Sequence, residues 1–179
     1  MSCLNLLDDI HAKGEKALVF VESLAMQEWL AFYLRERYQL ERHPARIYGD
    51  TPADRRTAIV DRFQSTPKGE FAVLLLSPKA AGVGLTLTAA THVIHLTRWW
   101  NPAVEDQCTD RAYRIGQTED VTVYYLQALH PLYGDASFDC ILDKLLTRKR
   151  TLSKGMLMPL ETGDELEEIF RSLAGVGQA

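Results

Sequence analysis

Four short apolar runs set the pattern of this 179-residue chain. They are Ala17–Val21, Val73–Leu76, His92–Leu96 and Val121–Leu126, and Arg46–Tyr48 is a shorter fifth candidate. Runs of this length that are rich in β-branched and aromatic residues are typical of buried strands. Longer segments with helical character separate them, which favours parallel strands joined by helical crossovers. The pattern therefore predicts an α/β fold with one parallel sheet flanked by helices.

One helix between the runs is predicted to start at Thr51 and Pro52 and to direct Ile59, Val60 and Phe63 inward. Two other segments also carry helical signals. Ala25–Tyr38 is amphipathic, and Trp29, Leu30, Tyr33 and Leu34 can share one face of a helix. We expect this face to pack on the sheet.

The second helical signal begins at Asn101 and Pro102. Proline suits a first helical turn, because its fixed backbone angle is already helical and its missing N–H is not needed there. We expect this helix to run to about Ile115, where Gly116 suits a C-terminal cap.

The character of the chain changes after Leu126. Ser137–Arg150 is predicted to be an amphipathic helix, and residues 151–163 a linker before a short acidic helix. We therefore divide the chain into a core of residues 1–130 and a helical extension of residues 131–179.

Composition and charge narrow the class of protein. Hydrophobic residues make up 46% of the chain and charged residues 25%, which is ordinary for a globular domain. The formal net charge is −4, so any DNA contact must come from a local basic patch. Cys3, Cys108 and Cys140 form no Cys-x-x-Cys pair, and the five histidines show no ligand spacing. No signal peptide and no membrane-spanning run is visible, so we expect a reduced, metal-free intracellular protein.

The most informative segment is QCTDRAYRIGQ, residues 107–117. On a helix, Gln107, Arg111 and Arg114 would lie at positions i, i+4 and i+7, which is one face. Two guanidinium groups and an amide in a row suit a phosphate chain, because arginine keeps its charge and presents forked donors. The spacing is also compatible with a solvated basic face on which Asp110 pairs with an arginine.

Two smaller features carry candidate chemistry. Gly82 and Gly84 lie two residues apart and would let the backbone approach a ligand closely, although a tight strand-to-helix turn is the alternative. Trp99 and Trp100 are adjacent, so on a strand they would point in opposite directions, one into the core and one outward. Burial of both rings is the alternative.

A basic run lies near the end of the predicted extension, with positive side chains at Lys144, Arg148, Lys149, Arg150 and Lys154. We interpret it as a solvated helix end that complements the helix dipole, and the alternative is a DNA-facing brace.

The segment DRAYRIGQ resembles motif VI of the Swi/Snf-type helicase-like ATPases, whose usual form is Gln-x-x-Asp-Arg-Ala-x-Arg-Ile-Gly-Gln. Residues 74–102 are similar to motif V and the Trp-Asn-Pro segment that follows it. KALVFVES near residue 16 and the segment 49–63 resemble earlier blocks of the same lobe. The resemblance covers about residues 12–130 in the right order, and WWNP with an intact RIGQ is similar to bacterial members.

This resemblance implies a single RecA-like lobe, the second motor lobe of an ATP-dependent translocase on double-stranded DNA. Arg111 and Arg114 would be arginine fingers that reach ATP held by the first lobe, with Gln107 beside the γ-phosphate. Gly82 and Gly84 would lie near the nucleotide.

The resemblance also assigns the DNA track. Ser77 and Lys79 would face DNA phosphates, and Trp100 would contact the tracked strand without reading its sequence. The family has a second adjacent glycine and an asparagine where this chain has Ala81 and Thr86. The contacts of this loop therefore stay open.

The sequence has no Gly-x-x-x-x-Gly-Lys-Ser/Thr loop, and no Asp-Glu pair follows an apolar strand. We expect a first lobe, in the same or another chain, to bind the ATP phosphates and Mg²⁺, and the isolated chain to be inactive. The expected location is cytoplasmic, and nucleoid-associated if the protein is bacterial. Three alternatives are a non-catalytic binding protein derived from such a lobe, an RNA-dependent helicase lobe, and a Rossmann-like enzyme. The missing third glycine at position 87 disfavours the last.

Overall fold

The computed structural model describes residues 2–155, apart from the side chains of residues 81–83 and 153–155. These residues form two compact units. The first unit contains residues 2–97 and 103–126, and the second contains residues 98–102 and 127–155. Each unit has its own cluster of buried hydrophobic side chains. In the described part of the chain, no helix is both long and apolar enough to cross a membrane.

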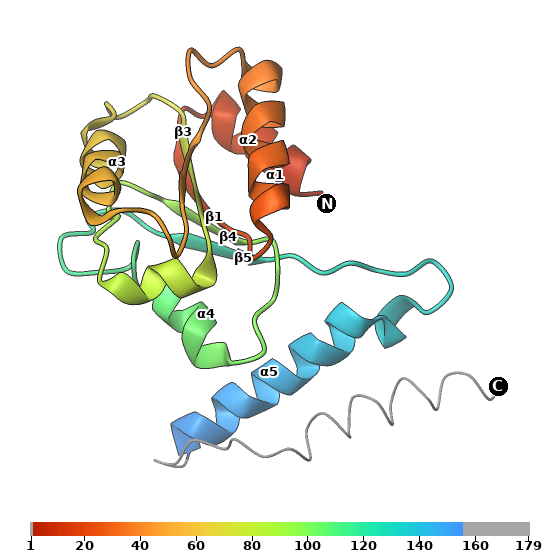
Figure 1. Ribbon diagram of the computed structural model, residues 1–179. Helices are drawn as coiled ribbons and strands as arrows, with labels where there is room; N and C mark the ends of the chain where they lie inside the picture. The colour runs from red at the N-terminus through yellow and green to blue at the C-terminus, as the bar shows by residue number, and fades with distance from the viewer. Residues whose placement is uncertain (1, 156–179) are drawn as a thin grey trace. The chain divides into compact units, whose positions relative to one another are not determined.

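A parallel sheet of five strands forms the centre of the first unit (Figure 1). The strands are β1 (Lys16–Phe20), β2 (Ala45–Ile47), β3 (Ala72–Leu76), β4 (His92–His95) and β5 (Thr122–Tyr125). They lie in the order β2-β3-β1-β4-β5, and each neighbouring pair is parallel. The predicted α/β fold is confirmed, and each predicted strand matches the observed one to within one residue at either end.

Successive side chains of the central strand β1 alternate between the two faces of the sheet and join a buried cluster on each. Leu18 and Phe20 join one buried cluster. Ala17 and Val19 join the buried cluster on the opposite face. Because successive side chains point to opposite faces, a strand covered on both sides needs a continuous apolar run.

Helices cover both faces of this sheet (Figure 1). They are α1 (Cys3–Ala12) and α2 (Leu24–Tyr38) on one face, and α3 (Ala53–Ser65), the 3-10 helix η1 (Pro78–Val83) and α4 (Pro102–Thr109) on the other. Because all five strands are parallel, their carboxyl ends lie at the same end of the sheet, where the loops that follow them meet.

The N-terminal helix α1 is an element that the sequence pattern does not predict. Its buried residues are Leu6, Leu7 and Ile10, too few to establish a helical period. A paired contact fixes it to α2, because the Arg37 guanidinium donates hydrogen bonds of 2.7 and 2.6 Å to the two Asp8 carboxylate oxygens. These bonds lower the pKa of Asp8 to about 2.

The inward face of α2 differs from the predicted one. Leu30 and Leu34 are buried as predicted, but Trp29 is 53% exposed and stacks on Tyr33. Gln27 is fully buried instead, and its amide nitrogen donates a 2.7 Å hydrogen bond to a backbone carbonyl. The prediction for Trp29 is wrong, because a hydropathy pattern does not anticipate an inward glutamine whose amide nitrogen bonds to the backbone.

The second unit is built on α5 (Phe138–Gly155), which follows the short 3-10 helix η2 (Gly134–Ala136). The helix continues past Arg150, so the predicted linker is wrong for residues 151–155. The rest of that predicted linker and the acidic helix lie outside the described residues. Leu142 and Leu146 are the buried members of its hydrophobic cluster.

Two glycines at the start of strands provide a test of the fold. Gly14 and Gly69 both have positive φ angles, +65° and +89°, which side chains rarely adopt. A Cβ on Gly14 would lie 2.1 Å from the Gly69 carbonyl oxygen, whereas a Cβ on Gly69 would meet no atom within 4 Å. The two positions therefore separate backbone strain from steric clash.

We expect Gly69→Ala to lower the free energy of unfolding by roughly 1 kcal/mol, from backbone strain alone. Gly14→Ala should lower it by roughly 3 kcal/mol or more, because the backbone of a neighbouring loop must also move. Urea denaturation of both variants measures the difference. Equal losses would contradict the close approach of these two loops.

Candidate functional site

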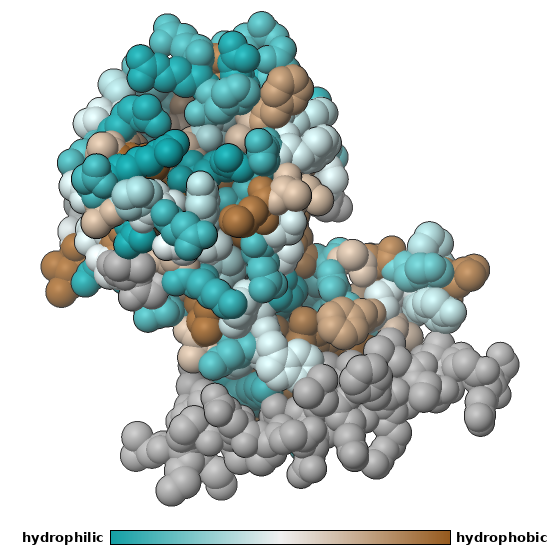
Figure 2. All heavy atoms as spheres, in the orientation of Figure 1, coloured by the Kyte–Doolittle hydropathy of each residue, from teal (hydrophilic) through white to brown (hydrophobic). Residues whose placement is uncertain are grey.

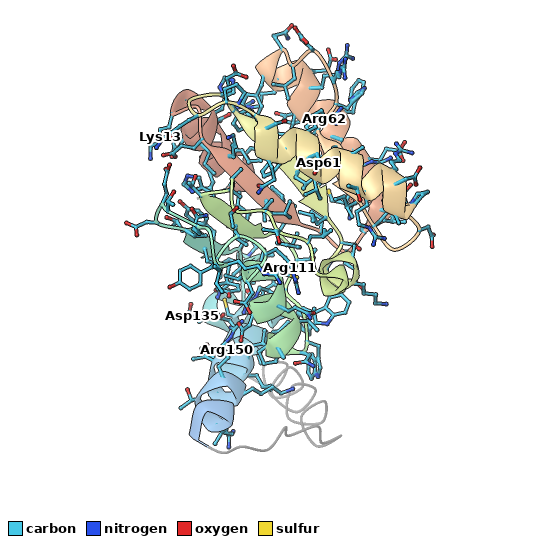
Figure 3. All side chains as sticks on the ribbon, turned by 90° about the vertical axis from the view of Figure 1, so that its left-hand side faces the viewer. Lys13, Asp61, Arg62, Arg111, Asp135 and Arg150 are labelled. Atoms are coloured by element: carbon cyan, nitrogen blue, oxygen red, sulfur yellow. The ribbon has the colours of Figure 1, made fainter. Side chains whose placement is uncertain are left out.

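Two loops of the first unit carry three of the eight predicted site residues, Gly84, Arg111 and Arg114. The glycine loop, Gly84–Ala90, follows η1, and the arginine loop, Asp110–Glu119, follows α4. The hydrogen bond from the Leu87 N–H to the Arg111 carbonyl oxygen is 2.8 Å long and joins the two loops. Figure 3 labels Arg111 next to α4. The site is therefore a pair of loops, and its geometry depends on how they are held together.

The helix α4 ends at Thr109, which corrects the predicted helix through Ile115. In a continuing helix the Arg111 carbonyl would accept the N–H of Ile115. That carbonyl instead accepts the Leu87 N–H, and the next residues form turns. The prediction that Gln107, Arg111 and Arg114 share one helical face is therefore wrong. Gln107 is exposed on α4, and both arginines lie on the loop.

The side-chain amide of Gln117 holds the two loops together. Its nitrogen lies 2.9 Å from the Thr88 carbonyl oxygen, 3.0 Å from that of Ala90 and 3.3 Å from that of Ala112. Its two N–H groups are therefore shared among three carbonyls. Its oxygen accepts the N–H groups of Thr118 and Glu119 at 3.0 Å. The sequence indicates Gln117 only as the last residue of a motif, since a hydrogen-bond network between distant loops has no local signal.

A second glutamine holds the glycine loop from the opposite side. The Gln64 side chain on α3 accepts the Ala89 N–H at 2.8 Å and donates to the Thr88 hydroxyl at 3.1 Å. The loop is thus tied to α3 by one amide side chain and to the arginine loop by another. No feature of the sequence pattern singles out Gln64.

Arg114 reaches from the arginine loop to the start of the glycine loop. One of its terminal nitrogens lies 3.2 Å from the Gly84 carbonyl oxygen, 3.4 Å from that of Leu85 and 3.2 Å from the Thr86 hydroxyl. The Arg114 side chain is otherwise exposed. Gly84, whose φ of +70° favours glycine, ends η1 and turns its carbonyl toward this arginine. Gly84 and Arg114, which the sequence assigns to neighbouring parts of the site, are therefore in direct contact.

Arg111 is buried, with 8% of its surface exposed. Its Nε atom has no hydrogen-bond partner among the described residues. An unpaired buried donor on a charged group is unfavourable by about 1 to 3 kcal/mol or more. The guanidinium therefore has an unused donor at a place where a protein normally satisfies every polar atom.

Arg111 and Arg114 border one open hollow of about 680 Å³. Its lining residues are Asp110, Arg111, Tyr113, Arg114, Ile115, Gln117 and Glu119. Gln107 is not among them. Nearby, burial raises the pKa of the Cys108 thiol to about 12, so this cysteine is not a thiolate nucleophile at neutral pH. Among the described residues, no group of three or more His, Cys, Asp or Glu side chains is placed to hold a metal ion.

The remaining residues predicted in this region lie at the carboxyl end of β3. Ser77 is buried, and its hydroxyl oxygen accepts the Ala80 N–H at 3.3 Å, which caps the start of η1. Lys79 is exposed in the first turn of η1, and Gly82 lies further along the same helix. Ser77 therefore has a structural role in starting the helix that presents Lys79.

Trp100 belongs to the second unit. Its ring is half-buried and packs against Leu142 and Leu146 of α5. The ammonium group of Lys149 lies 5.2 Å from the centre of the Trp100 ring, within the range of a cation–π contact. The neighbouring Arg98 forms an ion pair with an α5 carboxylate. The sequence does not predict these contacts, because the partners are more than forty residues apart along the chain.

Comparison with known proteins identifies the relatives of this chain. Residues 2–116 match the family model described as helicase conserved C-terminal domain. The chain is 40% identical to the Zorya protein ZorD of Escherichia coli O139:H28, over 90% of this chain and 15% of that protein. It is 38% identical to YwqA of Bacillus subtilis, named as an ATP-dependent helicase/translocase, over 93% of this chain and 18% of that protein. The chain thus spans less than a fifth of either relative.

Solved structures show the same fold. The Sulfolobus solfataricus SWI2/SNF2 ATPase core domain is 30% identical with a TM-score of 0.65, covering 93% of this chain and 33% of that chain. The same core in complex with double-stranded DNA is 33% identical with a TM-score of 0.62, covering 83% of this chain and 29% of that chain.

The network around Gln117 yields a testable prediction. Gln117→Ala should lower the free energy of unfolding by about 1 to 3 kcal/mol, because carbonyls and N–H groups of both loops lose their partner. Hydrogen exchange should become faster at Thr118, Glu119 and Leu87. Gln117→Glu keeps the acceptor but loses the donor, so it should leave Thr118 and Glu119 protected and still expose Leu87.

The matched control is Gln107→Ala, which removes an exposed glutamine of the same segment. It should leave exchange in both loops unchanged. If Gln107→Ala and Gln117→Ala had equal effects, the bracing role assigned to Gln117 would be wrong.

Proposed function

This chain belongs to the Swi/Snf-type family of helicase-like ATPases as its helicase C-terminal domain, and we propose that it acts as the second motor lobe of an ATP-driven translocase on double-stranded DNA. In this proposal it supplies arginine fingers and part of the DNA track. A first lobe, in the same or another chain, supplies the phosphate loop and the magnesium ligands.

The observation that carries the proposal is the unpaired, buried Nε of Arg111 beside Arg114 at one hollow. A buried guanidinium with an unused donor fits an anionic oxygen, since charge-assisted hydrogen bonds are about twice as strong as neutral ones. The hollow is open, so a phosphate held by another lobe can reach it. The arrangement thus supports a site that is completed from outside this chain.

The two arginines would have different tasks when ATP and Mg²⁺ are bound. Phosphoryl transfer itself comes from the nucleotide, and the protein stabilises charge on the transferring group. Arg111 is held rigidly by its backbone bond to Leu87, so it would present a fixed donor. Arg114 is exposed and bonded to neutral acceptors, so it would exchange these for phosphate oxygens. Gln107 would approach the same phosphate only after the lobes close.

This exchange suggests how nucleotide and DNA sites communicate. When Arg114 leaves Gly84 and Thr86, the start of the glycine loop loses its contact with the arginine loop. The glycine loop directly follows η1, which begins at Ser77 and Lys79, the residues assigned to DNA phosphates. A change at one end of this continuous segment would therefore alter the other.

The DNA partner rests on the family and on one relative. The Sulfolobus solfataricus core is known in complex with double-stranded DNA. In this chain Lys79 and Trp100 are the proposed contacts, and Lys149 would add positive charge beside the Trp100 ring. One face of the Trp100 ring packs on α5, so the other face could contact a DNA sugar. Such a contact would hold the DNA strand without reading its sequence.

The first functional prediction concerns the arginines. In the two-lobed protein, Arg111→Ala or Arg114→Ala should lower ATP turnover by roughly a thousandfold or more, with a smaller change in ATP affinity. DNA-stimulated phosphate release and nucleotide binding measure the two effects. The matched control is Arg35→Ala, a partly exposed arginine on α2 that pairs with Glu36, which should not change turnover.

Comparison of duplex DNA, single strands and RNA as stimulants separates a DNA translocase from an RNA helicase lobe. The isolated 179-residue chain should release no phosphate above background. Wild-type turnover in both arginine variants, or steady hydrolysis by the isolated chain that depends on Arg111, would overturn the proposal.

The second prediction concerns Trp100. In the two-lobed protein, Trp100→Ala should retain part of the ATPase rate but shorten the distance moved per ATP, because about 1 to 3 kcal/mol of grip is lost. Leu146→Ala removes a fully buried neighbour of the same cluster and controls for packing. Translocation on duplex DNA, ATPase rate and melting temperature are measured together. If Leu146→Ala shortens the distance moved per ATP as strongly as Trp100→Ala does, the packing of the cluster and not a DNA contact explains the effect.

A further inference from the structure

The sheet of the first unit has an open edge at β2. This strand pairs with β3 on one side, and no described strand lies on its other side. β2 is also shorter than its neighbour, since its three residues face Leu74–Leu76 and leave Ala72 and Val73 of β3 without a partner there. Backbone groups at such an edge can pair with an incoming strand.

A groove follows this edge. Because α2 and α3 lie on opposite faces of the sheet, they form its two walls (Figure 1). One hollow of about 610 Å³ is lined by Glu28, Ala31, Phe32, His43, Pro44, Ala45, Arg46, Tyr48, Arg55, Ala58, Ile59 and Arg62. A second hollow of about 300 Å³ shares His43, Pro44, Ala45, Ile59 and Arg62 with it and reaches Ala72 and Val73. Together the two hollows extend along β2 and reach the first two residues of β3, which have no strand partner on that side.

The groove carries excess positive charge. Arg46, Arg55 and Arg62 line its larger part, against a single carboxylate, Glu28. Arg46 lies 3.8 Å from Glu28, but neither Arg55 nor Arg62 forms an ion pair within the described residues. Arg55 and Arg62 are exposed and lie seven residues apart on α3, which places them on one face about two turns apart. Figure 3 labels Arg62 on this helix, and Figure 2 shows a mostly hydrophilic surface between α3 and α2.

The opposite wall offers an apolar contact. Phe32 of α2 is 58% exposed and stacks on His43. Ile59 lies buried in the floor below. The α2 wall thus offers an aromatic ring beside the Glu28 carboxylate, which lies 3.8 Å from Arg46, and the α3 wall is basic.

We propose that this groove binds an acidic, extended segment of a partner protein, which adds to β2 as a further strand. Side chains of an added strand alternate between the two faces of the sheet. Those directed toward α3 would be carboxylates that pair with Arg55 and Arg62, and those directed toward α2 would be apolar and contact Phe32. The open backbone of the edge supplies main-chain hydrogen bonds, and the walls supply specificity.

A peptide fits this groove better than nucleic acid does. A phosphate chain would use the arginines but would leave the Phe32 ring and the open backbone edge without partners. The alternating walls match the period of a strand, whereas a nucleic acid backbone carries charge at each step.

The test uses the full 179-residue chain and a fluorescent peptide that alternates glutamate with valine. We expect saturable binding in fluorescence anisotropy, with chemical-shift changes at the backbone amides of Arg46 and Ile47. Arg55→Glu with Arg62→Glu should weaken binding by about tenfold or more. The charge-matched control, Lys13→Glu with Arg35→Glu, changes an exposed lysine and a partly exposed arginine outside the groove and should stay within about twofold of wild type.

Two further comparisons test the apolar wall and the strand addition. Phe32→Ala should weaken binding, whereas Trp29→Ala, an equally exposed aromatic of α2 outside the groove, should not. A proline in the middle of the peptide should abolish binding, because it cannot donate to a strand ladder.

Several results would overturn the proposal. They are the absence of saturable binding, equal affinity for a lysine–valine peptide, and equal loss in the two charge-reversed variants. A short duplex DNA whose binding is lost only in the Arg55 and Arg62 variant, while the acidic peptide does not bind, would assign the groove to nucleic acid instead.

Discussion

One hydrogen bond between distant parts of the chain, from the Leu87 N–H to the Arg111 carbonyl, determines the geometry of the candidate site. The helix α4 ends at Thr109, and the Arg111 carbonyl, which a continuing helix would use for the Ile115 N–H, is bonded to Leu87 instead. Both arginines therefore lie on a loop. On a continuous helix, Arg114 would lie on the same rigid face as Gln107. On the loop it reaches the glycine loop directly. The Leu87–Arg111 bond and the contacts of Arg114 thus join the two loops.

The rest of the first unit keeps this bond in place. The central strand β1 is buried on both faces, and its backbone groups are paired with a neighbouring strand on each side. It therefore fixes the position of the loops at the carboxyl ends of the strands. Gln64 and Gln117 then satisfy the polar groups of the glycine loop from two directions. Against this background of satisfied groups in the two loops, the Nε of Arg111 is one of the few buried side-chain atoms without a hydrogen-bond partner in the described part of the chain. Such exceptions concentrate at functional sites, where a ligand completes the hydrogen bonding.

The two edges of the sheet are not equivalent. The outer strand β5 directly follows the arginine loop, whose side chains have the proposed role in ATP chemistry. β2 lies at the other end of the strand order, and its short length leaves an open groove between two helices. A lobe of this architecture can therefore close on nucleotide at one place and hold a partner at another. The second unit adds a separate cluster in which α5 supports Trp100.

The sequence by itself determined the strands, their parallel arrangement and the family, because apolar runs and contiguous motifs are local signals that survive without the fold. It also predicted Arg111, Arg114 and Gly84 as site residues, and the fold brings Arg114 into contact with Gly84. Only the tertiary structure decided where α4 ends, that Trp29 faces outward, and which side chains brace the loops. Each of these depends on a partner that is distant in sequence: Gln117 bonds to a loop 27 to 29 residues away, and Trp100 packs on a helix more than forty residues further along. Periodicity reports which face of an element is apolar, but a hydrogen bond or ring contact between remote segments exists only once the chain has folded.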